Sequence, residues 1–147
     1  MAKIVRSIRS GSNVTGLGET NSSDQLEGRY AVEVATLTDG ATITPDFGAN
    51  QNFTVTLGGN RTLANPSNMV VGQVGCIFVV QDGTGGRTLS FGSSYDFIGA
   101  TTPILSTTAN SIDRIDYIVR TASSIHTVFT AGYALALIHI SEPTRPY

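Results

Sequence analysis

The stretch QDGTGGRTLSFG at residues 81–92 is the first candidate for a chemical site, because a glycine-rich loop can bind phosphate. A phosphate-binding loop needs a Lys followed by Ser or Thr at its end, and then a helix whose N-terminus faces the phosphate. Here an Arg-Thr pair ends the loop, and the residues after it alternate as a strand does. The dinucleotide-binding pattern GxGxxG is absent as well. The glycines supply the positive φ angles that hairpin loops of this length need, so we predict the turn of a β-hairpin.

Nucleophilic catalysis would need a nucleophile, a base and a group that orients the base. The two histidines are His126, in a predicted strand with Thr and Ile neighbours, and His139, near the C-terminus. Neither is linked by a sequence pattern to a Ser or to Cys76, the single cysteine. Cys76 lies in the apolar run GCIFVV, where a free thiol behaves as a small buried hydrophobe. A single cysteine also excludes an internal disulfide. We predict that none of these residues is catalytic.

A pair of carboxylates could cleave a glycan if both groups converged on one sugar. Asp113 and Asp116 are the nearest acidic pair on a predicted strand. Their spacing of three residues places them on opposite faces of that strand, so they cannot converge. Arg114 and Arg120 are close enough in sequence to neutralise them. We predict a structural role for both carboxylates.

A metal site would need several clustered oxygen or nitrogen ligands. Asp39, Asp46 and Asp82 occur singly in predicted turns, where Asp is favoured because it hydrogen-bonds the local backbone. No DxDxDG-type loop is present. The sequence therefore predicts no catalytic residues, no metal site and no cofactor.

The composition favours β-structure as the scaffold for these residues. Only 14% of the 147 residues are charged, against a usual value of about 25%. The polar surface must therefore be built from Thr, Ser, Asn and Gly, which suits strands and turns. No segment repeats apolar residues at helical spacing over ten or more positions, and exact internal repeats are not visible.

Several segments have the pattern of strands. The clearest is QNFTVTL (51–57), in which Phe53, Val55 and Leu57 share one face. The segment VGCIFVV (74–80) is apolar on both faces, which is typical of a central strand in a packed sandwich. Other predicted strands are AVEVATL (31–37), ATIT (41–44), RTLA (61–64), RTLSF (87–91), IDRIDYIVR (112–120) and SIHTVFTA (124–131).

Eight to ten short strands at roughly ten-residue spacing predict an all-β fold, an antiparallel β-sandwich of jelly-roll type. Residues 1–30 are poor in core-forming groups, and we expect an N-terminal arm and linker there. The β-sandwich domain is expected at 31–136, and a non-native tail at 137–147.

The charge distribution suggests an anchoring role for the arm. Lys3, Arg6 and Arg9 lie in the first ten residues, whereas the rest of the chain is mildly acidic. These three residues could dock the arm on an acidic partner, or they could form a solvated tail. The net charge of −2 is too small to imply a nucleic-acid or membrane-surface partner. We expect no signal peptide and no membrane insertion, because the N-terminus lacks the necessary apolar stretch.

The last eleven residues, LIHISEPTRPY (137–147), resemble the translation of a sequencing-library adapter. If the resemblance holds, His139, Glu142 and Arg145 have no evolved role, and the natural C-terminus differs from this one. The alternative is a native strand extension with a proline-rich end.

Residues 47–134 carry a resemblance to a known family. The elements are NRTLANPSN, the segment from VGQ through IFVVQDGTGGRTLSFG, the turn LSTTAN, and DYIVR followed by SIHTVFTAGYA. This stretch resembles modules in structural proteins of tailed bacteriophages, especially the β-sandwich ends of tail fibres or fibre-like appendages. The resemblance implies turns and strands but no catalytic residues.

The resemblance implies a non-enzymatic virion protein, made in the host cytoplasm and assembled with other virion proteins as a homotrimer. Its arm would anchor it, and its loops would contact a host-surface glycan or protein. A capsid (head) decoration protein is the alternative interpretation. A free carbohydrate-binding module and a glycan-cleaving enzyme are the remaining hypotheses.

Overall fold

A computed structural model of the chain describes residues 32–134, which form nine β-strands and one short 3-10 helix, η1. The strands are β1 (Val34–Thr36), β2 (Thr42–Ile43), β3 (Asn52–Leu57), β4 (Arg61–Leu63), β5 (Val74–Gln81), β6 (Leu89–Phe91), β7 (Tyr95–Phe97), β8 (Ile112–Thr121) and β9 (Ser124–Tyr133), and η1 spans Ile98–Ala100. The predicted all-β class is confirmed. The expected arm and tail lie outside the described residues, and the domain boundaries stay predictions.

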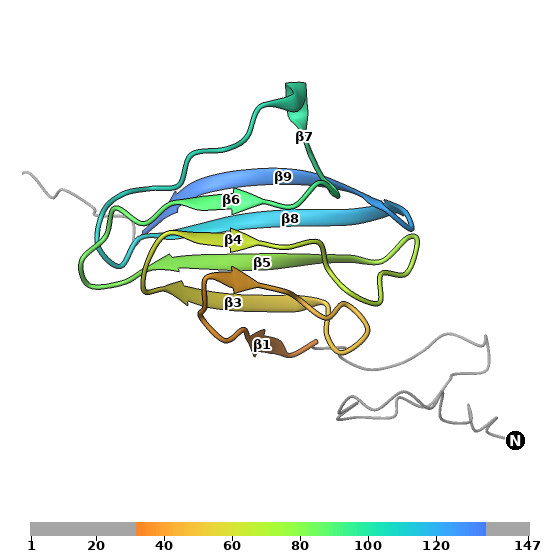
Figure 1. Cartoon of the computed structure of the whole chain (residues 1–147), viewed down its shortest axis with the longest axis horizontal. Coiled ribbons are helices and arrows are strands. Elements are labelled where there is room, and N and C mark those ends of the chain that lie inside the picture. The colour runs from red at the N-terminus through yellow and green to blue at the C-terminus, as the bar shows by residue number, and fades with distance from the viewer. Residues whose placement is uncertain (1–31, 135–147) are drawn as a thin grey trace, which may run out of the picture.

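The strands form two sheets that enclose one hydrophobic core (Figure 1). The large sheet has six strands in the order β1-β3-β5-β8-β9-β7, and the small sheet has three in the order β2-β4-β6. Both sheets contribute buried side chains to the same cluster, which makes the fold a two-layer sandwich.

The expectation of antiparallel pairing is correct for only two strand pairs, β5–β8 and β8–β9. The pairs β1–β3, β3–β5, β2–β4, β4–β6 and β7–β9 are all parallel. The sheets are therefore mixed, and the jelly-roll connectivity that we expected is not confirmed.

The parallel pairing follows from where the turns lead the chain. From β1 to β6 the chain alternates between the large and the small sheet. After each complete coil the chain comes back to the same sheet, and the new strand runs in the same direction as the previous strand of that sheet. The turns at Asp39-Gly40, Gly58-Gly59 and 82–88 are therefore arches between the sheets and not hairpins within one sheet.

Side chains tie the successive arches together. Asp39 lies in the first arch, and Arg61 follows the second arch. The Asp39 carboxylate accepts hydrogen bonds from Arg61 Nε at 2.8 Å and from Arg61 Nη2 at 2.6 Å. Asn60 Oδ1 in the second arch accepts a hydrogen bond from the backbone N–H of Thr88 at 3.1 Å. These contacts hold the register between coils at this end of the sandwich.

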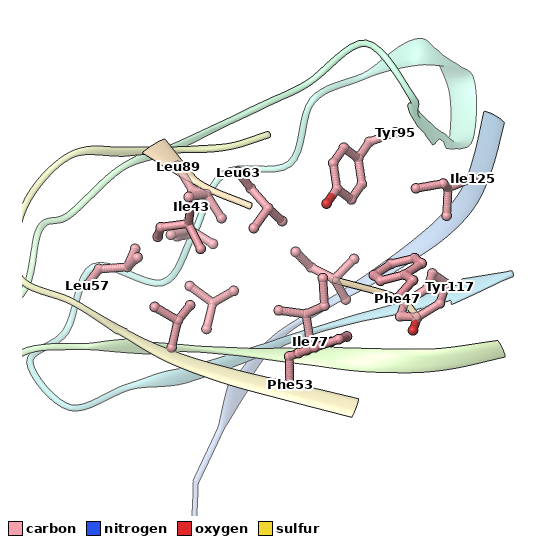
Figure 2. Packing of buried hydrophobic residues seen from close by; sticks show 14 of the residues in the cluster. Ile43, Phe47, Phe53, Leu57, Leu63, Ile77, Leu89, Tyr95, Tyr117 and Ile125 are labelled. Carbon is pink, nitrogen blue, oxygen red and sulfur yellow. The ribbon is translucent and has the colours of Figure 1, made fainter. Parts of the chain in front are cut away.

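The core confirms the period-2 pattern of the sequence. Phe53, Val55 and Leu57 of β3 all point inward and are at most 2% exposed. Figure 2 shows Phe53 and Leu57 facing the buried side chains of the small sheet, including Ile43 and Leu63. Complete burial of aliphatic and aromatic side chains of this size contributes roughly 1.5–3 kcal/mol each.

An aromatic stack closes the core near the start of β3. The ring of Phe47 stacks on that of Tyr117, with centroids 4.3 Å apart, and on that of Phe53, with centroids 5.7 Å apart. The Tyr117 hydroxyl donates a 2.6 Å hydrogen bond to the carbonyl oxygen of Gln51. Gly75 lies opposite Tyr117 in the sheet, and a β-carbon there would overlap both the hydroxyl and that carbonyl oxygen. The glycine is therefore required by space and not by its φ angle.

The prediction that VGCIFVV forms a central strand of a sandwich is confirmed, although only one of the two faces of this strand is covered. β5 is central in the large sheet, and its inward residues Ile77 and Val79 are at most 1% exposed. Its outward residues Cys76, Phe78 and Val80 are only half-buried. In residues 32–134 no second layer lies over them.

Candidate functional site

The glycine-rich loop binds its own carboxylate instead of a phosphate. Asp82 Oδ1 accepts hydrogen bonds from the backbone N–H groups of Thr84 at 3.0 Å and Gly85 at 2.9 Å. The N–H of Gly86 donates to the Thr107 carbonyl oxygen at 2.9 Å. These amides are therefore occupied by internal acceptors. No helix follows the loop, because the chain enters β6 directly.

The same loop is closed by a two-point ion pair. Arg87 donates to Asp82 Oδ2 from Nη2 at 2.7 Å and from Nε at 3.0 Å. The buried Gln81 side chain bonds both the N–H and the carbonyl oxygen of Arg87, at 2.8 and 2.9 Å. The Arg87 hydrogen bonds, followed by that from the Gly85 amide, lower the pKa of Asp82 to about 2. The segment is a turn, as predicted, but it joins the two sheets, so the expected hairpin is wrong.

Asp113 is a buried carboxylate with a structural set of partners. It is 0% exposed and lies at an irregularity in the pairing of β8 with β9. Its oxygens accept hydrogen bonds from the Ser106 N–H at 2.8 Å, the Ser106 hydroxyl at 2.7 Å and the Gly132 N–H at 2.8 Å. Asp113 thus fastens the 105–111 connection and the end of β9 to β8.

Asp116 points to the other side of β8, as its spacing from Asp113 predicts. Its side chain is half-exposed and accepts a 2.9 Å hydrogen bond from Arg114 Nε. Asp113 faces the core, so the two carboxylates cannot act on one sugar. Arg114 also lies over the Tyr133 ring, with Cζ 5.1 Å from the centroid.

Cys76 and His126 do not form a nucleophile–base pair. Both lie on the outer face of the large sheet, Cys76 on β5 and His126 on β9, with β8 between them. Two strand spacings and a two-residue offset separate them by roughly 12 Å. Partial burial, followed by the nearby Asp116 charge, raises the pKa of the Cys76 thiol, which disfavours the reactive thiolate.

The turn aspartates are each occupied by protein donors. Asp46 accepts hydrogen bonds from Asn68 Nδ2 at 2.8 Å and from the Gly48 N–H at 2.9 Å, and these lower its pKa. Asp39 and Asp82 each face an arginine. Between residues 32 and 134 no three acidic, His or Cys side chains gather into a potential metal site. In that same range no helix has the length and apolar character to cross a membrane.

The proposed anchoring residues Lys3, Arg6 and Arg9 lie outside the described residues, as do His139, Glu142 and Arg145. Their roles stay predictions.

The tip loop, residues 98–104, is the first of two surfaces suited to contact with another molecule. It follows β7 and projects away from the two sheets before Leu105 returns to the core (Figure 1). Ile98 is 79% exposed and Ile104 is 86% exposed. Gly99 and Ala100 both have positive φ angles, 68° and 54°, which set the sharp bend of the loop. Two isoleucines held this far from any core indicate a contact surface.

The second surface is the polar outer side of the small sheet. Thr42, Thr62 and Ser90 occupy successive strands at the same register position. The hydroxyls of Thr62 and Ser90 are 2.8 Å apart and hydrogen-bond each other. A row of hydroxyls can offer hydrogen bonds to a polar partner such as a glycan.

Neither surface could be located from the sequence. Ile104 lies in the apolar run PIL (103–105), and only the position of this run after the β7 edge reveals that Ile104 is exposed. The hydroxyl row depends on the parallel register of β2, β4 and β6, which we did not predict.

The comparisons with known proteins agree with the predicted resemblance. Residues 43–120 match the family described as "Putative phage tail fibre C-terminal domain". No curated protein and no solved structure matches the chain significantly. The family match runs from the end of β2 to the end of β8 and covers more than half of the 147 residues. A domain of this family is a structural part of the phage virion and associates with other virion components. The chain therefore belongs to the family of phage tail fibre C-terminal domains.

Proposed function

We propose that this chain is a non-enzymatic module of a phage tail fibre or fibre-like appendage, and that it works as a homotrimer. In this role the tip loop contacts the host surface or a neighbouring virion protein. The observation that carries the proposal is the exposure of Ile98 and Ile104, 79% and 86%, on a loop that projects from the sandwich. Large apolar side chains exposed on one short projecting loop favour a role in interaction, because exposed apolar surface marks interaction sites.

The absence of enzymatic activity is supported by how the acidic side chains are used. Asp113 is sequestered by Ser106 and Gly132, and Asp82 is neutralised by Arg87. A general acid or base must reach the proton that it transfers. Neither carboxylate can do so without breaking bonds that hold the fold.

The remaining parts of the chain have supporting roles in this proposal. Lys3, Arg6 and Arg9 anchor the N-terminal arm on an acidic patch of a virion protein. The hydroxyl row of Thr42, Thr62 and Ser90 assists the tip loop by hydrogen-bonding a host glycan or protein.

A binding experiment with a matched control tests the role of the tip loop. The full chain, labelled with a fluorophore, is added to a panel of bacterial cells and to purified phage heads. Ile104→Asp should abolish binding to the cells that bind the wild type, while Val70→Asp, at a 63% exposed valine in a different loop, should bind normally. Binding to heads and not to cells would instead support a capsid decoration protein.

A second assay tests the proposal against a glycan-cleaving enzyme. Polysaccharide from a bound strain is incubated with the chain, and new reducing ends are measured. We expect none. The Asp116→Asn variant should fold normally. If the wild type released sugar and this variant did not, the non-enzymatic role would be refuted.

A further inference from the structure

The two outer faces of the sandwich differ in their chemistry. The small sheet presents the hydroxyl row of Thr42, Thr62 and Ser90. The outer face of the large sheet carries polar residues on β3 and β9, such as Thr54 and His126, but also exposed or half-buried apolar residues. These are Val34, Val74, Cys76, Phe78, Ile118 and Val128. Val34, Val74, Ile118 and Val128 are 44–55% exposed.

The middle of this face carries a contiguous apolar strip. Val74 of β5 pairs with Ile118 of β8, and Cys76, Phe78 and Val80 follow Val74 on the same side of β5. Neighbouring residues on one face of a sheet have side chains in contact distance, so these groups form one patch. Val128 and Val34 lie outside the strip, because Asp116 stands between Cys76 and Val128, and Asn52 stands between Cys76 and Val34.

The β5 strand gives the clearest reason to expect a cover over this patch. Its sequence VGCIFVV is apolar on both faces, as in strands that are buried from both sides. Alternate polar residues would be expected if the outer side were meant for water, as Thr54 and Thr56 are on β3. Cys76, Phe78 and Val80 instead leave an apolar surface at the middle of the sheet.

The charges of the face restrict what can cover it. Arg114 and Asp116 lie on it and pair with each other at 2.9 Å, so this pair adds no net charge. Arg120, at the end of β8, and Asp96, on β7, lie at the rim of the same face and carry opposite charges. The charges on these strands therefore cancel, and a face without net charge suits a second copy of itself better than a strongly charged partner.

The dimensions of the face suit three copies around an axis. The strands β3, β5, β8 and β9 span roughly 19 Å, and the eight residues of β5 extend about 27 Å, a face on the order of 500 Å². This is the same order as the roughly 800 Å² per partner that stable interfaces bury. If three such faces form the sides of a triangular prism, the middle of each sheet lies about 5.5 Å from the threefold axis. One layer of side chains, about 5 Å deep, fills this space.

We infer that the outer face of the large sheet is the surface through which three copies of this chain meet, with β5 and β8 nearest the threefold axis. This inference rests on the proposed homotrimer and names the interface within it. The tip loop and the hydroxyl row then point away from the axis and stay free for a partner.

Cys76 allows a direct test, because it is the single cysteine and lies on this face. The full chain is studied by light scattering on a size-exclusion column and by the rate of maleimide labelling. The wild type should be a trimer, and its labelling should slow on the order of tenfold between dilute and concentrated protein, because the thiol reacts only in the dissociated fraction. Ile118→Lys should give a monomer with fast labelling at every concentration.

Controls separate loss of assembly from loss of folding. Thr42→Lys places the same charge on the outer face of the small sheet and should stay trimeric with slow labelling. Circular dichroism should show that Ile118→Lys keeps the strand content of the wild type. If it unfolds, Val128→Lys, at a position 51% exposed, replaces it with the same expectation.

Each other outcome contradicts a distinct part of the inference. A wild type that is monomeric and labels quickly would overturn both the homotrimer and this interface. A trimer that survives Ile118→Lys with Cys76 open to maleimide would overturn only the interface. A monomer with Cys76 protected at every dilution would show that another segment of the same chain covers the face.

Discussion

Asp82 and Arg87 close the glycine-rich loop with a two-point ion pair, in which Asp82 Oδ2 lies 2.7 Å from Nη2 and 3.0 Å from Nε of the arginine. The other carboxylate oxygen takes the amides of Thr84 and Gly85. An internal anion therefore fills the position that a bound phosphate would need. The loop shapes the passage of the chain from the large sheet to the small one.

This arrangement predicts a loss of stability in acid. The folded state lowers the pKa of Asp82 from its usual value near 3.8 to about 2. A carboxylate with a lowered pKa stabilises the fold while it is ionised, so its contribution is present above pH about 4 and is lost as the pH falls through about 2. Asp82→Asn should unfold at lower urea than the wild type at pH 7, and the difference should vanish near pH 2.

Arg87→Gln provides the matched comparison, since it removes the partner of the same carboxylate. Its urea midpoint should fall at pH 7, and the double variant should lose less than the sum of the two single losses. A wild-type advantage over Asp82→Asn that persists unchanged at pH 2 would contradict the assignment.

Asp113→Asn should destabilise the fold strongly, although the side chain keeps its shape. The carboxylate of Asp113 accepts from two N–H groups and one hydroxyl, and an amide would turn one acceptor into a donor that faces another donor. Leaving buried donors without acceptors costs roughly 1–3 kcal/mol each. Chemical denaturation measures the loss. Asp116→Asn, on the half-exposed side of the same strand, should change stability by less than about 1 kcal/mol, and equal losses would refute the structural role of Asp113.

Gly75→Ala should destabilise the protein by about 2–3 kcal/mol, because overpacking a filled site forces the backbone or the ring aside. The added carbon would overlap the Gln51 carbonyl oxygen and the Tyr117 hydroxyl. Gly83→Ala is the control, since a β-carbon at that position meets no atom within 4 Å. Thermal melts of the two variants should differ clearly, and a wild-type melt for Gly75→Ala would show that the aromatic stack can move.

The positions of most strands could be predicted from sequence, but their pairing could not. The alternation of Phe53, Val55 and Leu57 is a local signal, and the structure buries all three. Whether Gly58-Gly59 joins two neighbours in one sheet or crosses to the other sheet depends on contacts such as Asp39 with Arg61, 22 residues apart. A glycine pair permits both geometries, so the parallel coils were missed.

The sequence predicted which residues are not catalytic more than it predicted which surfaces make contacts. The spacing of Asp113 and Asp116 correctly placed them on opposite faces, because strand geometry is local. The exposure of Ile104 could not be predicted, since an apolar residue beside Leu105 has the pattern of a strand. The burial of Leu105 and the exposure of Ile104 are decided by the path of the chain after β7.

Phe47→Ala should cost about 3–5 kcal/mol, the usual loss for an aromatic side chain removed from a core. The ring is 3% exposed and stacks on Tyr117 and Phe53. Phe78→Ala removes the same atoms from the half-buried outer face. In dilute protein, where the copies are dissociated, it should lower the free energy of unfolding much less than Phe47→Ala does. Denaturation at two protein concentrations separates the two contributions. The stability lost by removing a side chain from an interface between copies grows with protein concentration, whereas the stability lost in Phe47→Ala does not. If Phe78→Ala were as costly as Phe47→Ala in dilute protein, the outer face would be covered within a single chain.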